Sequence, residues 1–203
     1  MARLVYIVRH GNTFDKGDVV TRVGARTDLD LSVSGREQAR KLGEHFSDEN
    51  IIFSRAISSP LKRTRQTGWA ILEAQGRGIT LETADFLREI DYGPDENRPE
   101  DEVVARIGED ALAAWESDAV PPPGWQVEPN ELTDNWASLF DVLAGEASDS
   151  PALVVTSNGI ARFALKAAKA SDSHDLKLKT GAYGIMRISK GAQPELLGWN
   201  MRP

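Results

Sequence analysis

The sequence predicts an α/β fold, a three-layer sandwich whose mostly parallel central sheet carries helices on both faces. Short β-rich runs alternate with amphipathic stretches along the 203 residues, which is the order expected of such folds. The runs 4–8 and 153–156 are nearly continuous in apolar residues, as strands covered on both faces are. The length suits one domain with a substantial core, so we expect a single domain over residues 1–203.

The individual elements follow from hydrophobic periodicity and from start signals. The predicted strands are residues 4–8, 51–54, 79–82, 153–156, 182–188 and 195–199. The predicted helices are residues 34–46, 60–74, 100–117, 133–145 and 160–170. Ser34 and Glu37 spell a capping box, and Pro60 suits a first helical turn. The interval at about 89–150 holds helical patterns without a predicted strand, so we interpret it as a helical insertion over one edge of the sheet.

Composition excludes several classes of function. The net charge is −7, from 31 acidic and 24 basic residues, which argues against a nucleic-acid partner because phosphate backbones are bound through clustered Lys and Arg. The chain has no cysteine, so thiolate nucleophiles and Cys-ligated zinc are excluded. No run approaches the ~20 apolar residues of a membrane span, and no secretory signal is evident. We therefore expect a cytoplasmic protein without a membrane partner; the oligomeric state is not readable.

Polar residues follow the predicted strands, and ligands of open α/β sheets bind beyond the carboxyl ends of strands. Arg9, His10 and Gly11 follow the first strand. Arg9 offers a planar fork for phosphate oxygens, and His10 can act as a nucleophile or base near neutral pH. Gly11 allows close approach of the backbone. The alternative is a surface loop with a chance triplet.

Three further strand exits carry groups of the same kind. Residues 58–60 begin a predicted helix whose free N–H groups favour an anion, and Arg63 lies one turn in. Glu89 follows the strand at 79 and could protonate a leaving oxygen. Asn158 and Gly159 begin another helix and could form a second anion site. A basic helix, a solvated acidic loop and an Asn-Gly turn remain the plain alternatives.

Taken together and in this order, the motifs resemble the histidine phosphatase superfamily, also called phosphoglycerate mutase-like. The resemblance covers most of residues 3–168 and is carried by five strings. They are "VYIVRHGNT", "ARTDLDLSVSGREQARKLGEHF", "SSPLKRTRQT", "LREIDYG" and "VVTSNGIAR".

The resemblance implies roles for single residues. It implies that His10 is the nucleophile that forms a phosphohistidine, and that Glu89 is the acid that protonates the leaving group. It implies that Arg9 and Arg63 hold the phosphate, with Gly11 in the loop around the nucleophile. It implies no cofactor, because arginine side chains and helix N-termini can offset the charge on the transferring group.

One position departs from the family pattern. The fourth motif normally reads His-Gly, whereas this chain has Asn158 and Gly159. An amide can still donate a hydrogen bond to phosphate, but it cannot carry a positive charge. Neither His45 nor His174 fills the position by motif, and we expect the first to face solvent and the second to lie in a loop. The substitution predicts a slower enzyme or a rebuilt pocket.

Two main functions remain open on the sequence, and a third, removal of phosphate from phosphohistidine or phosphotyrosine in proteins, is favoured by no residue. One is a metal-independent phosphatase that hydrolyses a small phosphomonoester through His10, with no metal site. The other is a non-catalytic protein that binds a phosphorylated ligand. The part of the substrate beyond its phosphate could also be recognised. Arg98 could contact a second anionic group, and Trp115 or Trp125 could form a wall of the site. The plainer reading makes Arg98 a solvated loop residue and Trp115 part of a buried helix stripe.

Overall fold

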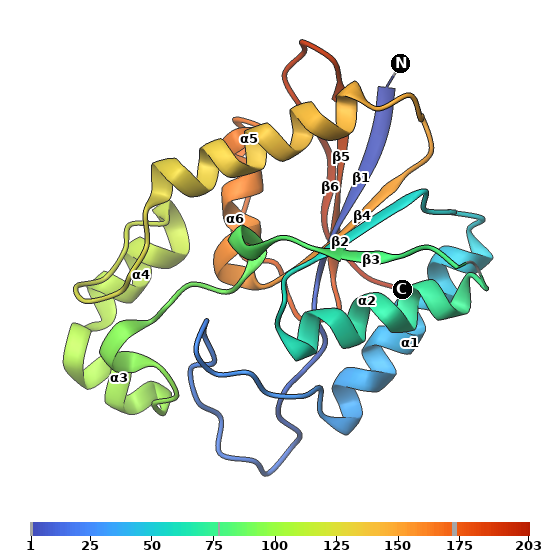
Figure 1. The fold of residues 1–203 in the computed structure, drawn as a ribbon. Helices are drawn as coiled ribbons and strands as arrows, with labels where there is room; N and C mark the ends of the chain where they lie inside the picture. Colours follow the sequence, from blue (N-terminus) through green and yellow to red (C-terminus); the bar gives the residue numbers. More distant parts are fainter. Residues whose placement is uncertain (1, 77, 172–173) are drawn as a thin grey trace.

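A six-stranded sheet organises the computed structural model, which describes residues 2–76, 78–171 and 174–203. The strand order is β3-β2-β4-β1-β5-β6 (Figure 1). The strands are β1 (Ala2–Arg9), β2 (Arg55–Ser58), β3 (Leu81–Thr83), β4 (Ala152–Thr156), β5 (Tyr183–Ser189) and β6 (Glu195–Met201). The first four pair in parallel, and β5 runs antiparallel to both β1 and β6. The predicted mostly parallel sheet is confirmed.

Both faces of the central strands are covered, as their apolar composition predicts. Val5 and Ile7 belong to one buried cluster, whereas Tyr6 and Val8 of the same strand belong to a second cluster on the other face. All five residues of β4 are buried. Because successive side chains of a strand alternate between the faces, a run without polar residues requires an apolar layer on each side.

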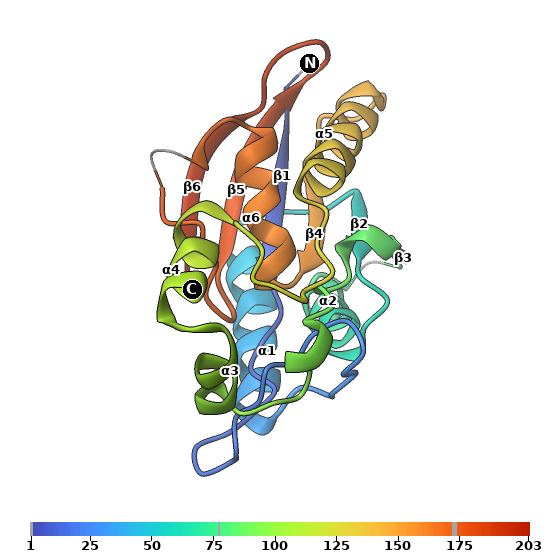
Figure 2. The same cartoon turned by 90° about the vertical axis from the view of Figure 1, so that its left-hand side faces the viewer.

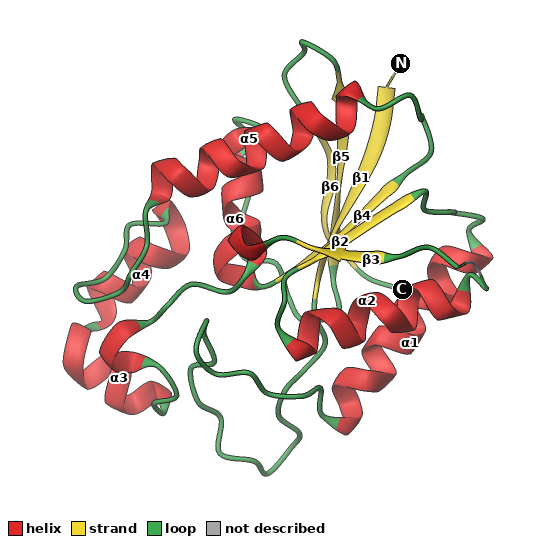
Figure 3. Ribbon diagram, in the orientation of Figure 1, coloured by secondary structure: helices red, strands yellow, loops and turns green. Residues whose placement is uncertain are grey.

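The helices supply these two layers, completing the three-layer sandwich (Figures 1 to 3). α1 (Val33–Asp48) and α2 (Lys62–Ala74) cover the face of Tyr6 and Val8, to which they contribute Leu42, Phe46 and Ile71. α5 (Pro129–Gly145) and α6 (Asn158–Ala167) cover the opposite face. Trp136 and Phe140 of α5 are buried there.

The segment between β3 and α5 lies to one side of the sheet in Figure 1. It contains the short 3-10 helices Asp85–Leu87 and Gly93–Asp95, followed by α3 (Glu100–Ile107) and α4 (Glu109–Asp118). Trp115 of α4 and Trp125 after it are buried in the cluster that α5 and α6 share. Within the described residues, no helix combines the length and apolar composition needed to cross a membrane.

The predicted strand at 51–54 is wrong, because residues 51 and 53 bond to helix ends, while the Ser54 N–H donates to the Pro151 carbonyl just before β4 begins. The N–H of Ile51 donates to the carbonyl of Phe46 near the end of α1, and that of Phe53 donates to the Gln75 side chain after α2. β2 instead begins at Arg55 and pairs with β4. Apolar residues in 51–54 therefore close the ends of two helices.

The predicted helices differ from the structure in their bounds. The helix predicted from Pro60 begins at Lys62, the one predicted from 133 begins at Pro129, and the one predicted at 160–170 spans Asn158–Ala167. The helix predicted at 100–117 is split at Gly108, whose φ of 84° ends α3 and starts α4. The helix predicted from Ser34 begins at Val33, and the residue that caps it is Ser32, whose side chain accepts a hydrogen bond from Gly35. Periodicity finds a helix, but the actual cap depends on which hydroxyl the preceding loop brings to the helix end.

Candidate active site

The carboxyl ends of β1 and β4 bring His10 and Asn158 to one edge of the sheet. The parallel register pairs Arg9 with Thr156, and the N–H of His10 extends it by donating to the Thr156 carbonyl at 3.1 Å. Ser157 then precedes α6, so Asn158 is the first residue of that helix. Two residues 148 positions apart in the chain therefore flank the same strand exit, as expected for an open α/β sheet.

The His10 ring is held in one tautomer by its two neighbours. Its Nδ1 lies 2.7 Å from the carbonyl oxygen of Gly11, and the Nε of Arg63 donates to its Nε2 at 3.2 Å. A carbonyl only accepts a hydrogen bond and a guanidinium only donates one. The proton therefore sits on Nδ1, and Nε2 keeps its lone pair, which is the requirement for a nucleophile.

Burial and two guanidinium groups keep this imidazole neutral. His10 is 6% exposed. Desolvation, followed by the charges of Arg63 and Arg9, lowers the pKa of His10 well below its usual value near 6.5. Removal from water and nearby positive charge both disfavour the imidazolium form. The ring is therefore in its neutral form at neutral pH, with one proton, on Nδ1.

Arg63, the second residue of α2, is fully buried and held at three points. Besides its bond to His10, its Nη1 donates to the Thr27 carbonyl at 2.8 Å and its Nη2 to the Gly24 carbonyl at 3.2 Å. Desolvation lowers its pKa, yet an arginine starts so high that it stays charged. This fixes a positive charge against the His10 ring.

Arg9 and Asn158 both bind the backbone of one residue, Leu178. Nη1 of Arg9 donates to the Leu178 carbonyl at 2.8 Å, and the Leu178 N–H donates to Oδ1 of Asn158 at 2.9 Å. Nε of Arg9 is buried without a hydrogen-bond partner among the described residues. Since the oxygen of the Asn158 amide is engaged by Leu178, the group it can offer an anion is its NH2 donor.

Glu89 reaches the site because two neighbouring backbone N–H groups hold its carboxylate. It is 5% exposed, and it accepts from Ile90 at 3.0 Å and from Gly159 at 3.3 Å. A Cβ on Gly159 would lie 2.2 Å from Oε1 of Glu89, so only glycine admits the carboxylate here. Gly11 has a similar role, since its Cβ would lie 2.3 Å from the Gly35 carbonyl oxygen at the start of α1.

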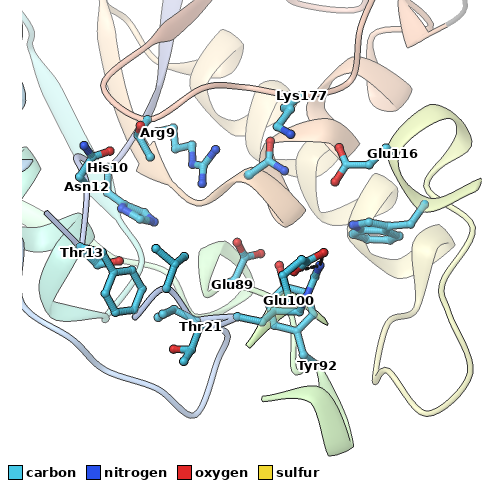
Figure 4. A pocket seen from close by; sticks show the side chains of 17 residues that line it. Arg9, His10, Asn12, Thr13, Thr21, Glu89, Tyr92, Glu100, Glu116 and Lys177 are labelled. Carbon is cyan, nitrogen blue, oxygen red and sulfur yellow. Dashed lines mark hydrogen bonds and ion pairs between the residues drawn. The ribbon is translucent and has the colours of Figure 1, made fainter. Parts of the chain in front are cut away.

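A cavity of about 390 Å³ joins these side chains. Arg9, His10 and Glu89 line it, as Figure 4 shows, and Asn158 lines it as well. Arg63 is not among the residues that line the cavity, but it contacts one of them, because its Nε donates to Nε2 of His10. The structure thus brings together all the polar side chains singled out from the strand exits. No group of three or more His, Asp or Glu side chains in the described ranges could hold a metal ion.

Some expectations about single residues are wrong. At the N-terminus of α2 the Lys62 N–H donates to the Asp28 carboxylate at 2.7 Å, so this N–H binds an anionic side chain of the protein itself and not the cavity. His45 does not simply face solvent: it is half-buried and bonds to the Tyr183 hydroxyl at 2.8 Å. Arg98 is exposed and pairs loosely with Glu102 at 3.5 Å, as the plainer reading holds.

The two tryptophans proposed as walls differ in role. Trp115 lines the cavity and is also part of the buried core, so both readings of it hold. Trp125 is buried behind the cavity and donates its indole N–H to Asp95 at 2.7 Å. His174 lies exposed in its loop and does not line the cavity.

Sequence reasoning missed six charged or aromatic residues that line the cavity, namely Phe14, Arg22, Tyr92, Glu100, Glu116 and Lys177. Arg22 lies over the Tyr92 ring at 5.2 Å and binds Glu100 at 2.5 Å. None of the six directly follows a predicted strand, although Tyr92 lies in the string "LREIDYG" and Glu100 begins a predicted helix.

The sequence profile of the histidine phosphatase superfamily (branch 1) matches residues 5–202. The chain belongs to this superfamily. Among curated relatives of this superfamily member are 2,3-bisphosphoglycerate-dependent phosphoglycerate mutases. That of Parvibaculum lavamentivorans is 33% identical over 61% of this chain and 59% of its own length. That of Baumannia cicadellinicola is 29% identical over 64% and 52%. The match thus spans less than two thirds of either mutase.

Solved structures share the fold of this histidine phosphatase family member over its whole length. A mycobacterial glucosyl-3-phosphoglycerate phosphatase has a TM-score of 0.80 at 20% identity, covering 99% of this chain and 100% of its own. A phosphoserine phosphatase of Entamoeba histolytica, solved with 3-phosphoglyceric acid, has a TM-score of 0.75 at 17% identity, covering 98% and 97%. At these identities the likeness concerns the fold.

Proposed function

We propose that this protein is a phosphatase that hydrolyses a small phosphomonoester through a phosphohistidine on His10. The observation that carries the proposal is the His10 ring, which is neutral and presents an unprotonated Nε2 to a cavity shared with Arg9 and Glu89. The superfamily supports phosphoryl transfer. The names of the solved neighbours, which include phosphatases of glucosyl-3-phosphoglycerate and phosphoserine, support small phosphorylated compounds as the substrate class.

In the first step, Arg63 transfers its Nε hydrogen bond from Nε2 of His10 to a phosphate oxygen, the freed Nε2 attacks phosphorus, and the bond to the leaving oxygen breaks. That oxygen takes the proton of the Glu89 carboxyl group, which the Gly159 and Ile90 N–H groups hold at the cavity wall. Arg9 and Arg63 offset the charge on the equatorial oxygens, as fixed donors do in phosphoryl transfer.

In the second step, water attacks the phosphohistidine. The Glu89 carboxylate takes a proton from that water, the N–P bond breaks, and Nε2 recovers its lone pair. Inorganic phosphate leaves, and Glu89 is again protonated for the next turnover. The Gly11 carbonyl keeps Nδ1 protonated throughout, so the same ring nitrogen serves each cycle.

Asn158 limits the rate in this scheme. A neutral amide in place of a charged donor forfeits about 1–2 kcal/mol, the gap between neutral and charge-assisted hydrogen bonds. If this loss falls wholly on the transition state, turnover drops roughly 5- to 30-fold, because ~1.4 kcal/mol is tenfold. Nucleophile, both arginines and acid remain, so we expect a slow enzyme.

The test is turnover of p-nitrophenyl phosphate and of a panel of phosphorylated metabolites, compared with the His10→Ala variant. We expect release of phosphate by the wild-type protein and its loss in the variant. Acid-labile phosphate trapped on the wild-type protein, identified by ³¹P NMR, would establish the intermediate. Turnover equal to that of His10→Ala across the panel overturns the proposal.

A second candidate function is a protein that binds a phosphorylated ligand without turning it over. Asn158 favours it, because the neutral amide weakens stabilisation of the transferring group while still donating to a bound phosphate. Tight binding of phosphorylated ligands, with neither turnover nor a trapped phosphohistidine, would select this function over the first.

A further inference from the structure

One wall of the cavity is the segment that precedes β5, and four hydrogen bonds fix its backbone. Leu178 binds Asn158 through its N–H and Arg9 through its carbonyl. The side chain of Asn200 in β6 holds both flanking residues, donating to the Lys177 carbonyl at 2.5 Å and accepting from the Lys179 N–H at 2.8 Å. The segment is therefore tied both to the proposed phosphate ligands and to the sheet.

Lys177 extends from this segment into the cavity. It lines the cavity, and Figure 4 shows it on the wall that carries Arg9, with Glu89 on the other side. No carboxylate among the described residues forms an ion pair with it. Its ammonium is thus available to a bound ligand.

Lys177 is the neighbour in sequence of Leu178, which bonds to Asn158. Consecutive Cα atoms are about 3.8 Å apart, and the next residue binds Asn158 directly at 2.9 Å. Lysine carries a mobile ammonium on a flexible four-carbon stem. An oxyanion bound by the amide of Asn158 therefore lies within reach of the Lys177 ammonium.

The charges of the site leave room for a third cation. Arg9 and Arg63 bring two positive charges, whereas His10 and Asn158 bring none. A phosphoryl group carries close to two negative charges at neutral pH, and ionised Glu89 adds another in the second step. Arg22 and Glu116 also line the cavity, but they pair with Glu100 and Arg162. Two remaining cations then face three negative charges, and one more cation balances them.

We propose that Lys177 is a third cationic ligand of the phosphoryl group, acting beside Asn158. The proposal rests on the phosphoryl site of the proposed function, and it assigns the compensating charge to a loop residue outside every motif. Because Lys177 contacts the phosphoryl group itself, its contribution is independent of the leaving group.

The test compares Lys177→Met with Lys179→Met, a matched control on the same segment. Both lysines are exposed, but Lys179 does not line the cavity. The dissociation constants of inorganic phosphate and orthovanadate are measured by calorimetry. We expect Lys177→Met to weaken both roughly 10-fold or more, as loss of a charge-assisted hydrogen bond does. We expect Lys179→Met to stay within about twofold, and Lys177→Arg to retain most of the affinity.

Unchanged phosphate and vanadate affinity in Lys177→Met overturns the inference, even if KM for a larger substrate rises, since the lysine then contacts only the leaving group. Equal weakening by both variants also overturns it, because a general charge effect then suffices. Selective weakening without any turnover by the wild-type protein supports the Lys177 ligand while removing the proposed catalysis. The two proposals therefore fail separately.

Discussion

At the scale of single residues, His10 owes its chemistry to neighbours and not to its own type. The carbonyl of Gly11 selects the tautomer, and Arg63 donates a hydrogen bond to the other ring nitrogen at 3.2 Å. Burial and positive charge hold the pKa below the usual range. The same histidine on a surface would be half protonated near pH 6.5 and could expose either nitrogen.

The first prediction concerns the titration of His10. In an NMR titration we expect its ring resonance, identified by its loss in His10→Asn, to remain at the neutral position from pH 8 to below 6.5. Arg63→Met should raise its midpoint, since this guanidinium is the largest charged contributor to the shift. Arg65→Met is the control, because Arg65 stacks on Trp69 at 4.6 Å. A midpoint at or above 6.5 in the wild-type protein contradicts the prediction.

The sign of the linked stability follows from the direction of that shift. A group whose pKa is lower in the folded state stabilises the fold fully above its unfolded pKa, near 6.5 for histidine. Stability should therefore fall as pH drops below about 6.5 towards the folded pKa of His10. Urea unfolding at a series of pH values measures the free energy of unfolding. In the His10→Asn variant, the fall of this free energy below pH 6.5 should be smaller.

The second prediction uses Gly159 to displace Glu89. In Gly159→Ala the new methyl group meets the Glu89 carboxylate, so the acid moves while its charge remains. General acid catalysis is worth ~10²–10⁴-fold, and it matters most for a poor leaving group. We expect turnover of an alkyl phosphate to fall about 10²-fold or more, but that of p-nitrophenyl phosphate by less than about tenfold. Equal losses for both substrates would argue against an acid role, and Glu89→Gln should reproduce the unequal pattern.

At the scale of elements, periodicity locates helices and strands, whereas breaks and ends depend on single backbone positions. The pattern over 100–117 is continuous, yet the chain turns at Gly108 into two helices. This break lets α4 place Trp115 at the cavity while α3 carries Glu100 there. A backbone with φ of 84° is open to glycine and costly for other residues.

The third prediction follows from this break. Gly108→Ala should destabilise the protein by about 1–3 kcal/mol, the cost of a non-glycine residue in such a conformation. Gly145→Ala is the matched control. That glycine ends α5 without positive φ, and an added Cβ meets nothing within 4 Å. Chemical denaturation measures both, and an unchanged midpoint for Gly108→Ala would show that a continuous helix is tolerated.

At the scale of the whole molecule, the two ends of the parallel strands carry different kinds of interaction. The carboxyl edge carries the candidate site, whereas Arg3 near the other end of β1 ties distant segments together. It is 2% exposed and bonds to Ser54 at 2.9 Å, to the Ser150 carbonyl at 2.8 Å and to Glu146. An overall charge of −7 is compatible with a cationic site, because the field of a pocket is local.

The fourth prediction separates stability from ligand binding. Arg3→Met leaves the Leu143 and Ser150 carbonyl groups without the Arg3 donor, while Glu146 keeps Arg55. A buried acceptor that loses its partner costs about 1–3 kcal/mol. The phosphate dissociation constant should stay within about twofold, since the change lies at the opposite edge. Arg187→Met removes an exposed pair with Glu195 and should cost at most ~1 kcal/mol. A large change in phosphate affinity for Arg3→Met would contradict this separation.

The sequence by itself determined the layered α/β order and the exits at Arg9, His10 and Asn158. These follow from local rules: apolar runs form buried strands, and parallel strands end at one edge. The sequence pattern misplaced the second strand. Ile51 and Phe53 bond to Phe46 and Gln75 at helix ends, and these contacts cannot be read from the local pattern.

Only the tertiary structure decided the rest of the site. It chose the tautomer of His10, brought Arg63 to its Nε2 and placed Lys177 in the cavity. These outcomes depend on distances between segments far apart in the chain, which packing sets and no local pattern encodes. The sequence determines which charged and polar groups are present. The strength of their interactions depends on the distances between them, and only the folded structure sets those distances.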